Sequence, residues 1–470
     1  MMKMTLDLGL LHPVYLPIPT VWLVYALLFY LSIPLIIYII VPYFSYGTKS
    51  TQKRIIIYVV GDIGHSPRIC NHARSFSLLH FQVELCGYVD SELPDFISSD
   101  PNITVHPITR VEGLGLFKKV LFQCLVIGGH LWQLRGSDYI LVQNPPNIPL
   151  FPIVALYKLL FCFTRCKWII DWHNLGYSVL RLKLRAKNYH PLVVVAILIE
   201  WGFAKFFADY HLTVTKAMEQ FLVQRFKINP KRCVVLYDRP ADHFSALPMP
   251  FQKSREQVLA TEPFSFINEI LKGGNERQQL DFRRGDKIIV TSTSFTPDED
   301  IGVLLNALKQ YETESMVNNK SLPRILCIIT GKGPMKDQYI KEVAETEWKL
   351  CRVEFAWLSP EEYPRLLQVC DCGVSLHYST SGLDLPMKVL DMFGAGLPVL
   401  ARNYPVLSEL VTEDVNGLTF NNATELCHRL LAVIKDPVMF EKLKDGALKE
   451  SRILWQPGWE AAMKQAGVIH

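Results

Sequence analysis

The stretch SGLDLPMKVLDMFGAGLPVLAR, residues 381–402, contains a helix, a stop and a strand in immediate succession. Proline suits the first position of a helix, so we expect a helix from about Pro386. Gly394 and Gly396 predict its end, and the apolar run after them predicts a buried strand. A helix that leads directly into a buried strand is typical of a parallel sheet with crossover helices.

Three charged residues interrupt this apolar segment: Asp384, Lys388 and Asp391. Residues four and seven apart lie on one face of a helix, so the three predict a single polar stripe. A lysine one turn into a helix, close to open N-terminal amides, predicts an anion site suited to a phosphate. A salt-bridged surface stripe fits the same spacing, and these residues alone do not decide between the two.

Short apolar runs alternate with longer mixed segments over most of the chain. Each run predicts a strand: 54–61, 83–89, 103–108, 139–145, 168–174, 211–215 and 233–238, then 287–294, 325–333, 353–358, 372–377, 397–402 and 417–420. This rhythm predicts two Rossmann-like α/β domains, separated by a polar linker or insertion. Ligands of such sheets bind outside the carboxyl ends of the strands, so we expect a site in a cleft between the domains.

The N-terminal segment has a different composition. Between Asp7 and Lys49 there is no charged residue other than histidine, and residues 20–41 are apolar over a length that can cross a bilayer of roughly 30 Å. This run exceeds the apolar core of a signal peptide, so we expect a retained transmembrane anchor over 20–42. Basic residues follow it, which predicts a lumenal tail over 1–19 and cytosolic domains after the anchor.

Composition argues against two classes of protein, those that bind nucleic acid and those stabilised by a disulfide framework. A net charge of +4 over 470 residues provides no basic stripe for nucleic acid. Eleven cysteines, an odd number scattered through predicted strands and helices, do not form a disulfide framework and fit a reducing compartment. No histidines stand near the closest cysteine pairs at zinc-finger spacing, so we expect no structural metal.

Polar residues follow several predicted strands. In the second half these are Ser292, Ser294, and Lys332 with Gly333, where hydroxyls, amides and close backbone approach suit a phosphate. Arg239, between the halves, suits a diphosphate. Ordinary turns explain each of these positions equally well, and the coincidence of several such loops is more informative than any one.

The first half has different groups at its strand ends. Asp62, His65 and Arg68 lie in GDIGHSPR, and Asp171 and His173 lie in DWHNLGYS. A carboxylate or imidazole at such a position can deprotonate an acceptor hydroxyl. Any single histidine here also fits a purely structural role.

Three segments of the first half are unusually apolar for helices that cover a sheet: 115–134, 150–163 and 191–207. They predict either buried crossover helices or a face of the domain that contacts lipid.

Together these segments resemble the chitobiosyldiphosphodolichol β-mannosyltransferases of the endoplasmic reticulum, inverting enzymes of the GT-B class. The likeness extends from about residue 54 to 420 and is carried by GDIGHSPRICNHA, LVQNPPNIP, DWHNLGYS, VLYDRP, STSFTPDEDIGVLL, TGKGPMK and LHYSTSGLDLPMKVLDMFGAGLPV. It implies GDP-mannose as donor, GlcNAc2-diphosphodolichol as acceptor and a β-1,4 linkage formed on the cytosolic face of the endoplasmic reticulum membrane. It also allows other mannosyltransferases of the lipid-linked oligosaccharide pathway as partners.

The resemblance also implies roles for residues. The acceptor domain would be 43–240, the linker 241–285 and the donor domain 286–470. Amides from Gly382 onward and Lys388 would meet the diphosphate, Asp391 the ribose and Asp384 the mannose hydroxyls. We expect Asp171, His173 or Asp62 as general base, with Asp171 and His173 ranked first, and we expect no tightly bound cofactor.

Two alternatives remain at this point. One is a retaining α-mannosyltransferase of the same fold. The other is a non-catalytic subunit that binds a nucleotide sugar and recruits a transferase to the membrane.

Overall fold

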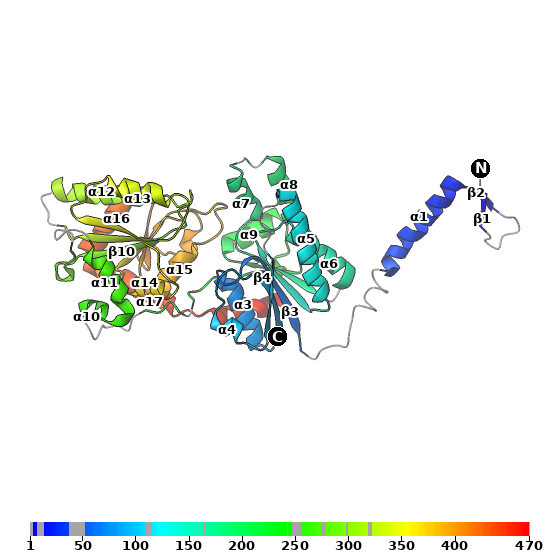
Figure 1. Ribbon diagram of the computed structural model, residues 1–470, viewed down its shortest axis with the longest axis horizontal. Coiled ribbons are helices and arrows are strands. Elements are labelled where there is room, and N and C mark those ends of the chain that lie inside the picture. Colours follow the sequence, from blue (N-terminus) through cyan, green and yellow to red (C-terminus); the bar gives the residue numbers. More distant parts are fainter. Residues whose placement is uncertain are drawn as a thin grey trace. The chain divides into compact units, whose positions relative to one another are not determined.

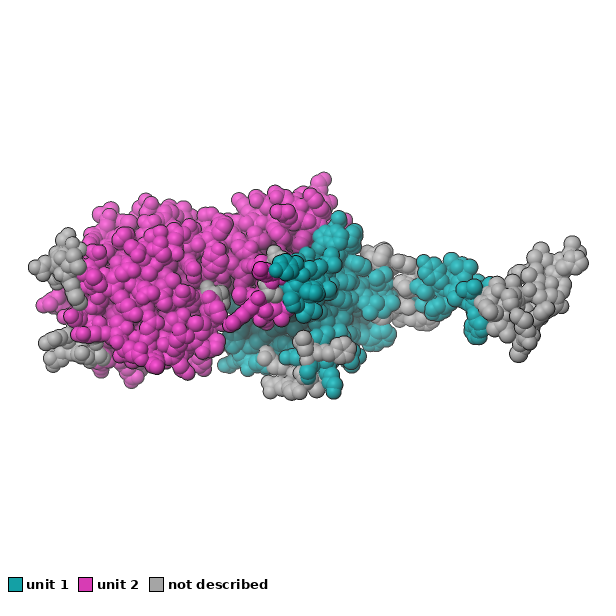
Figure 2. Space-filling model, turned by 90° about the horizontal axis from the view of Figure 1, so that it is seen from above, with its two compact units in different colours: residues 1–171, 189–211 teal, residues 172–188, 212–470 magenta. Residues whose placement is uncertain are grey.

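The computed structural model describes residues 3–6, 14–36, 52–109, 115–162, 166–185, 187, 189–241, 243–246, 255–273, 279–297, 299–317 and 322–469. The chain forms two compact units, residues 1–171 with 189–211 and residues 172–188 with 212–470 (Figure 2).

The first sheet has seven strands in the order β5-β4-β3-β6-β7-β8-β9. Pairs β3–β4, β3–β6 and β4–β5 are parallel. The strands are β3 (Arg54–Asp62), β4 (Gln82–Tyr88), β5 (Ile103–Pro107), β6 (Tyr139–Asn144), β7 (Lys167–Trp172), β8 (Tyr210–Thr213) and β9 (Cys233–Val235). Because central strands of a parallel sheet are covered on both faces, they appear in the sequence as unbroken apolar runs.

Helices connect these strands: α3 (Pro67–Leu78), α4 (Asp95–Ser98), α5 (Leu116–Gln133), α6 (Leu150–Tyr157), a π-helical turn (Lys158–Cys162), α7 (Gly176–Lys183), α8 (Pro191–Phe206), α9 (Lys216–Arg225) and a 3₁₀ turn (Pro230–Arg232). Local chemistry fixes several of their starts. Pro67 and Pro191 occupy the first turns of their helices, and the Thr215 hydroxyl accepts a hydrogen bond from the Met218 amide at 3.0 Å.

The second sheet has six strands in the order β12-β11-β10-β13-β14-β15, and all its neighbouring pairs are parallel. The strands are β10 (Lys287–Ser292), β11 (Ile325–Thr330), β12 (Cys351–Ala356), β13 (Cys372–Ser375), β14 (Val399–Arg402) and β15 (Gly417–Phe420). This is the doubly wound order, in which the chain reverses direction across the sheet between β10 and β13.

Helices cover both faces of this sheet (Figure 1). Ile289 and Cys327 pack in a core with α12 and α16, whereas Ile288 and Leu326 pack in a second core with α11, α14 and α15. The elements are α10 (Arg255–Leu259), α11 (Ser265–Lys272), α12 (Ile301–Val317), α13 (Lys336–Ala344), α14 (Glu362–Val369), α15 (Met387–Gly394), α16 (Ala423–Lys435), α17 (Pro437–Ser451), α18 (Trp455–Ala466) and 3₁₀ turns at Glu262–Phe264, Phe282–Arg284 and Leu407–Glu409.

The thirteen predicted strands are confirmed within a few residues at their ends, and so is the α/β class. Part of the predicted linker or insertion is folded. Leu259 and Ile267, from α10 and α11, are buried in the second core. Arg255 donates hydrogen bonds of 2.9 and 3.0 Å to the Asp371 carboxylate, which ties this segment to the sheet.

The N-terminal segment contains an antiparallel pair, β1 (Lys3–Leu6) with β2 (Val14–Pro17), followed by α1 (Ile18–Leu35). In the described part of the chain, no helix combines the length and the apolar character needed to cross a bilayer. The predicted span over 20–42 is therefore not confirmed, and its last residues, 37–42, lie outside the described part.

Candidate functional site

The loops that leave β10 and β13 meet where the strand order of the second sheet reverses. Glu299 and His377, one from each loop, form an isolated antiparallel bridge. In doubly wound sheets, ligands bind at the carboxyl ends of the strands next to such a reversal. The position therefore marks the candidate site.

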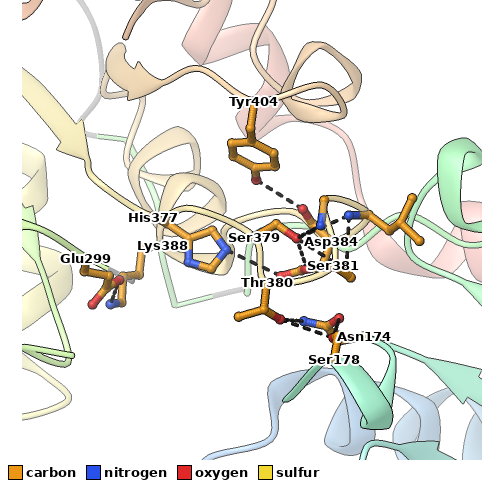
Figure 3. Close-up of polar contacts among 12 residues, drawn as sticks. Asn174, Ser178, Glu299, His377, Ser379, Thr380, Ser381, Asp384, Lys388 and Tyr404 are labelled. Atoms are coloured by element: carbon orange, nitrogen blue, oxygen red, sulfur yellow. Dashed lines mark hydrogen bonds and ion pairs between the residues drawn. The ribbon is translucent and has the colours of Figure 1, made fainter. Parts of the chain in front are cut away.

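Glu299 connects the two loops through its side chain. Its carboxylate accepts hydrogen bonds from the Ser294 amide at 2.6 Å and the Thr293 hydroxyl at 2.9 Å. It also accepts one from the Lys388 ammonium at 2.5 Å (Figure 3). Glu299 is 5% exposed, whereas the Lys388 side chain is 29% exposed. The glutamate thus holds the lysine in place while leaving part of it accessible to a ligand.

Asp384 lies in the loop before α15. Its carboxylate accepts hydrogen bonds from the hydroxyls of Ser379 and Ser381, and His377 Nε2 lies 3.4 Å from it. The helix begins at Met387, with Pro386 as its N-cap residue. The predicted stripe of Asp384, Lys388 and Asp391 on one helix is therefore wrong, because Asp384 belongs to a loop with its own hydrogen bonds.

Asp391 lies on α15 one turn after Lys388. Burial raises the pKa of its carboxyl to about 7, and the charge of Lys388 lowers it only in part. Tyr363, whose own pKa is raised by burial and by the charge of Asp391, accepts a 2.7 Å hydrogen bond from the Ser292 hydroxyl. Tyr363 is therefore hydrogen-bonded to Ser292 and lies close enough to Asp391 to be affected by its charge.

The raised pKa of Asp391 predicts a pH-dependent stability. Between about pH 4 and pH 7 the native carboxyl keeps a proton that the unfolded chain has lost, so the free energy of unfolding should fall as the pH rises. One proton corresponds to at most about 1.4 kcal/mol per pH unit. Urea unfolding of Asp391→Asn should show a smaller fall over this range than the wild type; equal slopes would contradict the assignment.

The loops after β10 and β11 lie in close backbone contact. A Cβ atom on Gly331 would lie 1.8 Å from the Thr293 carbonyl oxygen, and one on Gly333 would lie 1.7 Å from that of Ser294. Only glycine allows this approach. The Lys332 ammonium between them lies 3.7 Å from the centre of the Trp357 ring.

Two predicted donor-binding groups have other partners in the structure. The Gly382 amide donates to the Ser379 hydroxyl at 2.8 Å, so this amide is not open. The Arg239 guanidinium lies over the Tyr237 ring and 3.9 Å from the Glu450 carboxylate. Donor contacts by Gly382, Lys332 and Arg239 stay predictions.

The segment after β7 lies beside the loop that holds Asp384. Thr380 Oγ1 accepts a hydrogen bond from the side-chain amide of Asn174 at 3.3 Å (Figure 3). The Thr380 carbonyl accepts another from the Arg181 guanidinium at 3.0 Å. His173, which is partly exposed, immediately precedes Asn174. Among the three predicted bases, His173 is the one that these contacts bring to the Asp384 loop.

Asp171 is fully buried and ion-paired. Arg68 binds its carboxylate through two nitrogens at 2.7 to 3.1 Å, and His72 Nε2 lies 3.4 Å away. Both Asp171 and Arg68 are at most 2% exposed. Direct proton abstraction by Asp171 has no support in this geometry, although its assignment as the base stays a prediction.

We expect Asp171→Asn to destabilise the protein rather than alter its chemistry. Removing one partner of a buried ion pair costs about 3–5 kcal/mol, because Arg68 would remain buried without its counter-charge. Chemical denaturation measures the loss. A variant of wild-type stability that had lost only turnover would contradict this view and restore Asp171 as the base.

The Asp62 carboxylate is already hydrogen-bonded to neighbouring loop residues. It accepts hydrogen bonds from His65 Nδ1 at 2.6 Å, the Ser91 hydroxyl at 2.5 Å and the Asp90 amide at 3.1 Å. Burial opposes ionisation, but these hydrogen bonds lower the pKa of Asp62 to about 2. Such a carboxylate is a weak base near neutral pH, so the geometry favours His173 over Asp62.

The sequence interpretation missed several residues of this site, namely Glu299, His377, Ser379, Ser381, Asn174 and Thr380. Glu299 stands within the segment STSFTPDEDIGVLL, in which only Ser292 and Ser294 were predicted as site residues. His377 ends a predicted strand, which is a position where functional groups gather. Asn174 and Thr380 contact each other although they are 206 positions apart in the sequence, so no local sequence pattern indicates this contact.

Comparison with known proteins first identifies the class of enzyme. Residues 274–450 match the family model described as glycosyl transferases group 1. A crystal structure of a glycosyltransferase from Rickettsia africae has the same fold, with a TM-score of 0.60 and 13% identity over 88% of this chain and 99% of that chain. The two parallel-sheet α/β domains have the GT-B fold, and the matching family model identifies the chain as a glycosyltransferase.

Two curated relatives define the family more narrowly. A chitobiosyldiphosphodolichol β-mannosyltransferase of Candida glabrata is 54% identical over 462 residues, 97% of this chain and 99% of the relative. The protein of that name in Kluyveromyces lactis is 51% identical over 96% of this chain and 98% of its own length. The chain belongs to the chitobiosyldiphosphodolichol β-mannosyltransferase family.

Proposed function

We propose that this enzyme transfers mannose from GDP-mannose to GlcNAc2-diphosphodolichol in a β-1,4 linkage. The names of relatives that match nearly the whole chain support the acceptor and the sugar. The observation that carries the donor site is the partly exposed Lys388, which Glu299 holds in the first turn of α15. A diphosphate is the group that a lysine and open helix amides together bind best.

In the proposed reaction, O4 of the terminal GlcNAc attacks the anomeric carbon of mannose as the bond to GDP breaks. Negative charge develops on the leaving diphosphate, and Lys388 with the first amides of α15 stabilises it. Asp391 binds the ribose in its ionised form, and Asp384, held by Ser379 and Ser381, orients the mannose hydroxyls. The O4 proton passes to a general base.

We assign the base to His173, so His173→Ala should lower kcat with little change in KM for GDP-mannose. The expected loss is about 10²- to 10⁴-fold, the usual contribution of general base catalysis. Asn174→Ala serves as the control for a disturbed loop, because it removes the contact with Thr380 but no titratable group. Turnover of His173→Ala near that of wild type would exclude His173 and leave Asp62 as the next candidate.

We further propose that residues 20–42 anchor the protein in the endoplasmic reticulum membrane by a single pass, with its N-terminus in the lumen and both catalytic domains in the cytosol. The absence of charge between Asp7 and Lys49 and the basic residues that follow support this orientation. In that orientation the enzyme acts beside other mannosyltransferases of the same lipid-linked pathway.

The proposal is tested with purified full-length protein and a chitobiosyl-diphosphate linked to a prenyl chain. GDP-mannose, GDP-glucose and UDP-glucose are offered in parallel as donors. We expect transfer from GDP-mannose at least tenfold faster than from either of the others. Binding of GDP-mannose without transfer under any condition would instead support the non-catalytic subunit.

A further inference from the structure

Helices α5, α6 and α8 present an apolar outer surface. α6 packs against both α5 and α8, so the three form one layer (Figure 1). Large apolar side chains on this layer are more than a third exposed: Leu121, Leu125, Trp132, Leu156, Leu192, Val194, Val195, Leu198 and Phe206. We call this surface the α5–α6–α8 face.

Helix α8 shows why this exposure is unusual. Val193, Ala196, Glu200 and Ala204, at helical spacing, form its buried side. On the other side Leu192, Leu198 and Phe206 are 53%, 56% and 65% exposed. A helix that covers a sheet normally turns polar side chains outward, and a helix that is apolar all round lies either in a core or in lipid. We therefore expect lipid or another apolar surface to cover the outer side of α8.

The outer side of α8 also forms a groove. Leu198, Phe203 and Phe206 are among the residues that line it, and all the lining residues are apolar or glycine. Its volume is about 300 Å³. A groove of this kind accepts an acyl chain or an apolar side chain but offers no hydrogen bonds to a polar ligand.

Charge on the α5–α6–α8 face has one sign. Lys118 and Lys119 are exposed at the start of α5, and Lys205 lies near the end of α8. The one acidic residue in the sequence of these helices, Glu200, is fully buried and accepts a 2.8 Å hydrogen bond from Asn144. An apolar surface whose helices expose lysines and no acidic residue complements an anionic phospholipid headgroup layer.

Aromatic rings accompany these cations. The Lys205 ammonium lies 5.4 Å from the ring centres of Trp201 and Phe206. Just after α5, the Arg135 guanidinium lies 5.5 Å from the Trp132 ring. Rings and long cationic side chains of this kind combine an apolar body with a polar end, which suits the boundary between acyl chains and headgroups.

We propose that the α5–α6–α8 face lies in the interfacial layer of an anionic phospholipid bilayer. α8 has 16 residues and is shorter than the roughly 20 that a span requires, so it lies on the bilayer rather than across it. The inference deepens the proposed function and rests on it in one respect: an acceptor with a membrane-embedded prenyl chain requires the catalytic domains to be at the bilayer surface.

Depth-dependent fluorescence quenching tests the contact itself. An environment-sensitive fluorescent amino acid is incorporated at position 125 or 198 of the full-length chain, which is reconstituted in phosphatidylcholine vesicles with 30% phosphatidylserine. Position 438 is the control, because Val438 on α17 is apolar and 81% exposed. Nitroxide-labelled lipids should quench positions 125 and 198 at least threefold more than position 438.

Equal quenching at the three positions would overturn the proposal. So would protection of 125 and 198 from water without lipid quenching, together with cross-links to a second copy or to another protein, because that result would identify a protein as the cover.

Activity provides the second readout. Leu198→Glu with Phe206→Glu should reduce transfer to a long-chain prenyl acceptor in vesicles at least tenfold, while transfer to a water-soluble chitobiosyl-diphosphate analogue stays within twofold. The matched control, Val438→Glu, should change neither. Equal losses with both acceptors would indicate a folding defect and overturn the membrane interpretation of the loss. If the wild type transferred mannose to neither acceptor, the proposed function would fail while quenching still tested the membrane contact.

Discussion

Lys388→Ala should lower kcat/KM for mannose transfer by about 10²- to 10³-fold, or roughly 3–4 kcal/mol in transition-state stabilisation. Lys388 stands in the first turn of α15, and 29% of its side chain is exposed. The leaving diphosphate gains negative charge as the bond to mannose breaks, so a cation at this position acts more strongly on the transition state than on bound donor. Steady-state kinetics with GDP-mannose measures the effect, and the loss should fall mainly on kcat.

Two further variants separate chemistry from folding. Lys388→Ala leaves Glu299 nearly buried without its cation, which by itself costs stability. Adding Glu299→Gln removes that charge, so the double variant should regain thermal stability but not turnover. Lys309→Ala is the matched control, since Lys309 forms a 2.9 Å ion pair with Glu342 between α12 and α13. If the double variant regained turnover as well, Lys388 would be a structural residue only.

Gly333→Ala should impair both the stability of the protein and the binding of the donor. Its Cβ atom would lie 1.7 Å from the Ser294 carbonyl oxygen, a backbone atom that cannot swing aside. The loop after β10 must shift, and with it the Ser294 amide that binds Glu299. We expect a loss of about 2 kcal/mol or more in the free energy of unfolding and an increase of at least tenfold in KM for GDP-mannose.

The matched control for this variant is Gly458→Ala. Gly458 lies in α18, and a Cβ atom there meets nothing within 4 Å. Since alanine forms helix better than glycine, this change should preserve activity and raise stability by up to about 1 kcal/mol. Denaturation and steady-state kinetics, measured on both variants in parallel, show whether the effect is specific to Gly333. Wild-type behaviour of Gly333→Ala would mean that the two loops are not held in contact in solution.

The fold was largely predictable from the sequence because strands such as β10 and β11 are buried on both faces. Their apolar runs are continuous, and their β-branched residues separate them from the helices between. The structure of 255–272 was less accessible, because α10 and α11 are short and depend on tertiary contacts such as that between Arg255 and Asp371. Propensity alone does not stabilise helices of this length.

The position of the candidate site was predictable from the sequence, but the hydrogen bonds and ion pairs between its residues were not. The carboxyl ends of β10 and β13 were indicated by the polar residues that follow them. The partners were not, because Lys388 pairs with Glu299 across 89 positions and Asp171 pairs with Arg68 across 103. Asp384 and Lys388 looked like neighbours on one helix, yet α15 begins between them and the chain turns at that point.

The central claim is that this enzyme forms a β-mannosidic bond by a single displacement. The most direct measurement is the anomeric configuration of the product made from GDP-mannose and a prenyl-linked chitobiosyl-diphosphate, established by digestion with linkage-specific mannosidases. Our account predicts that β-mannosidase releases the transferred mannose and that α-mannosidase does not. Release by α-mannosidase would contradict it, because retention of configuration excludes direct attack of the acceptor opposite the leaving GDP.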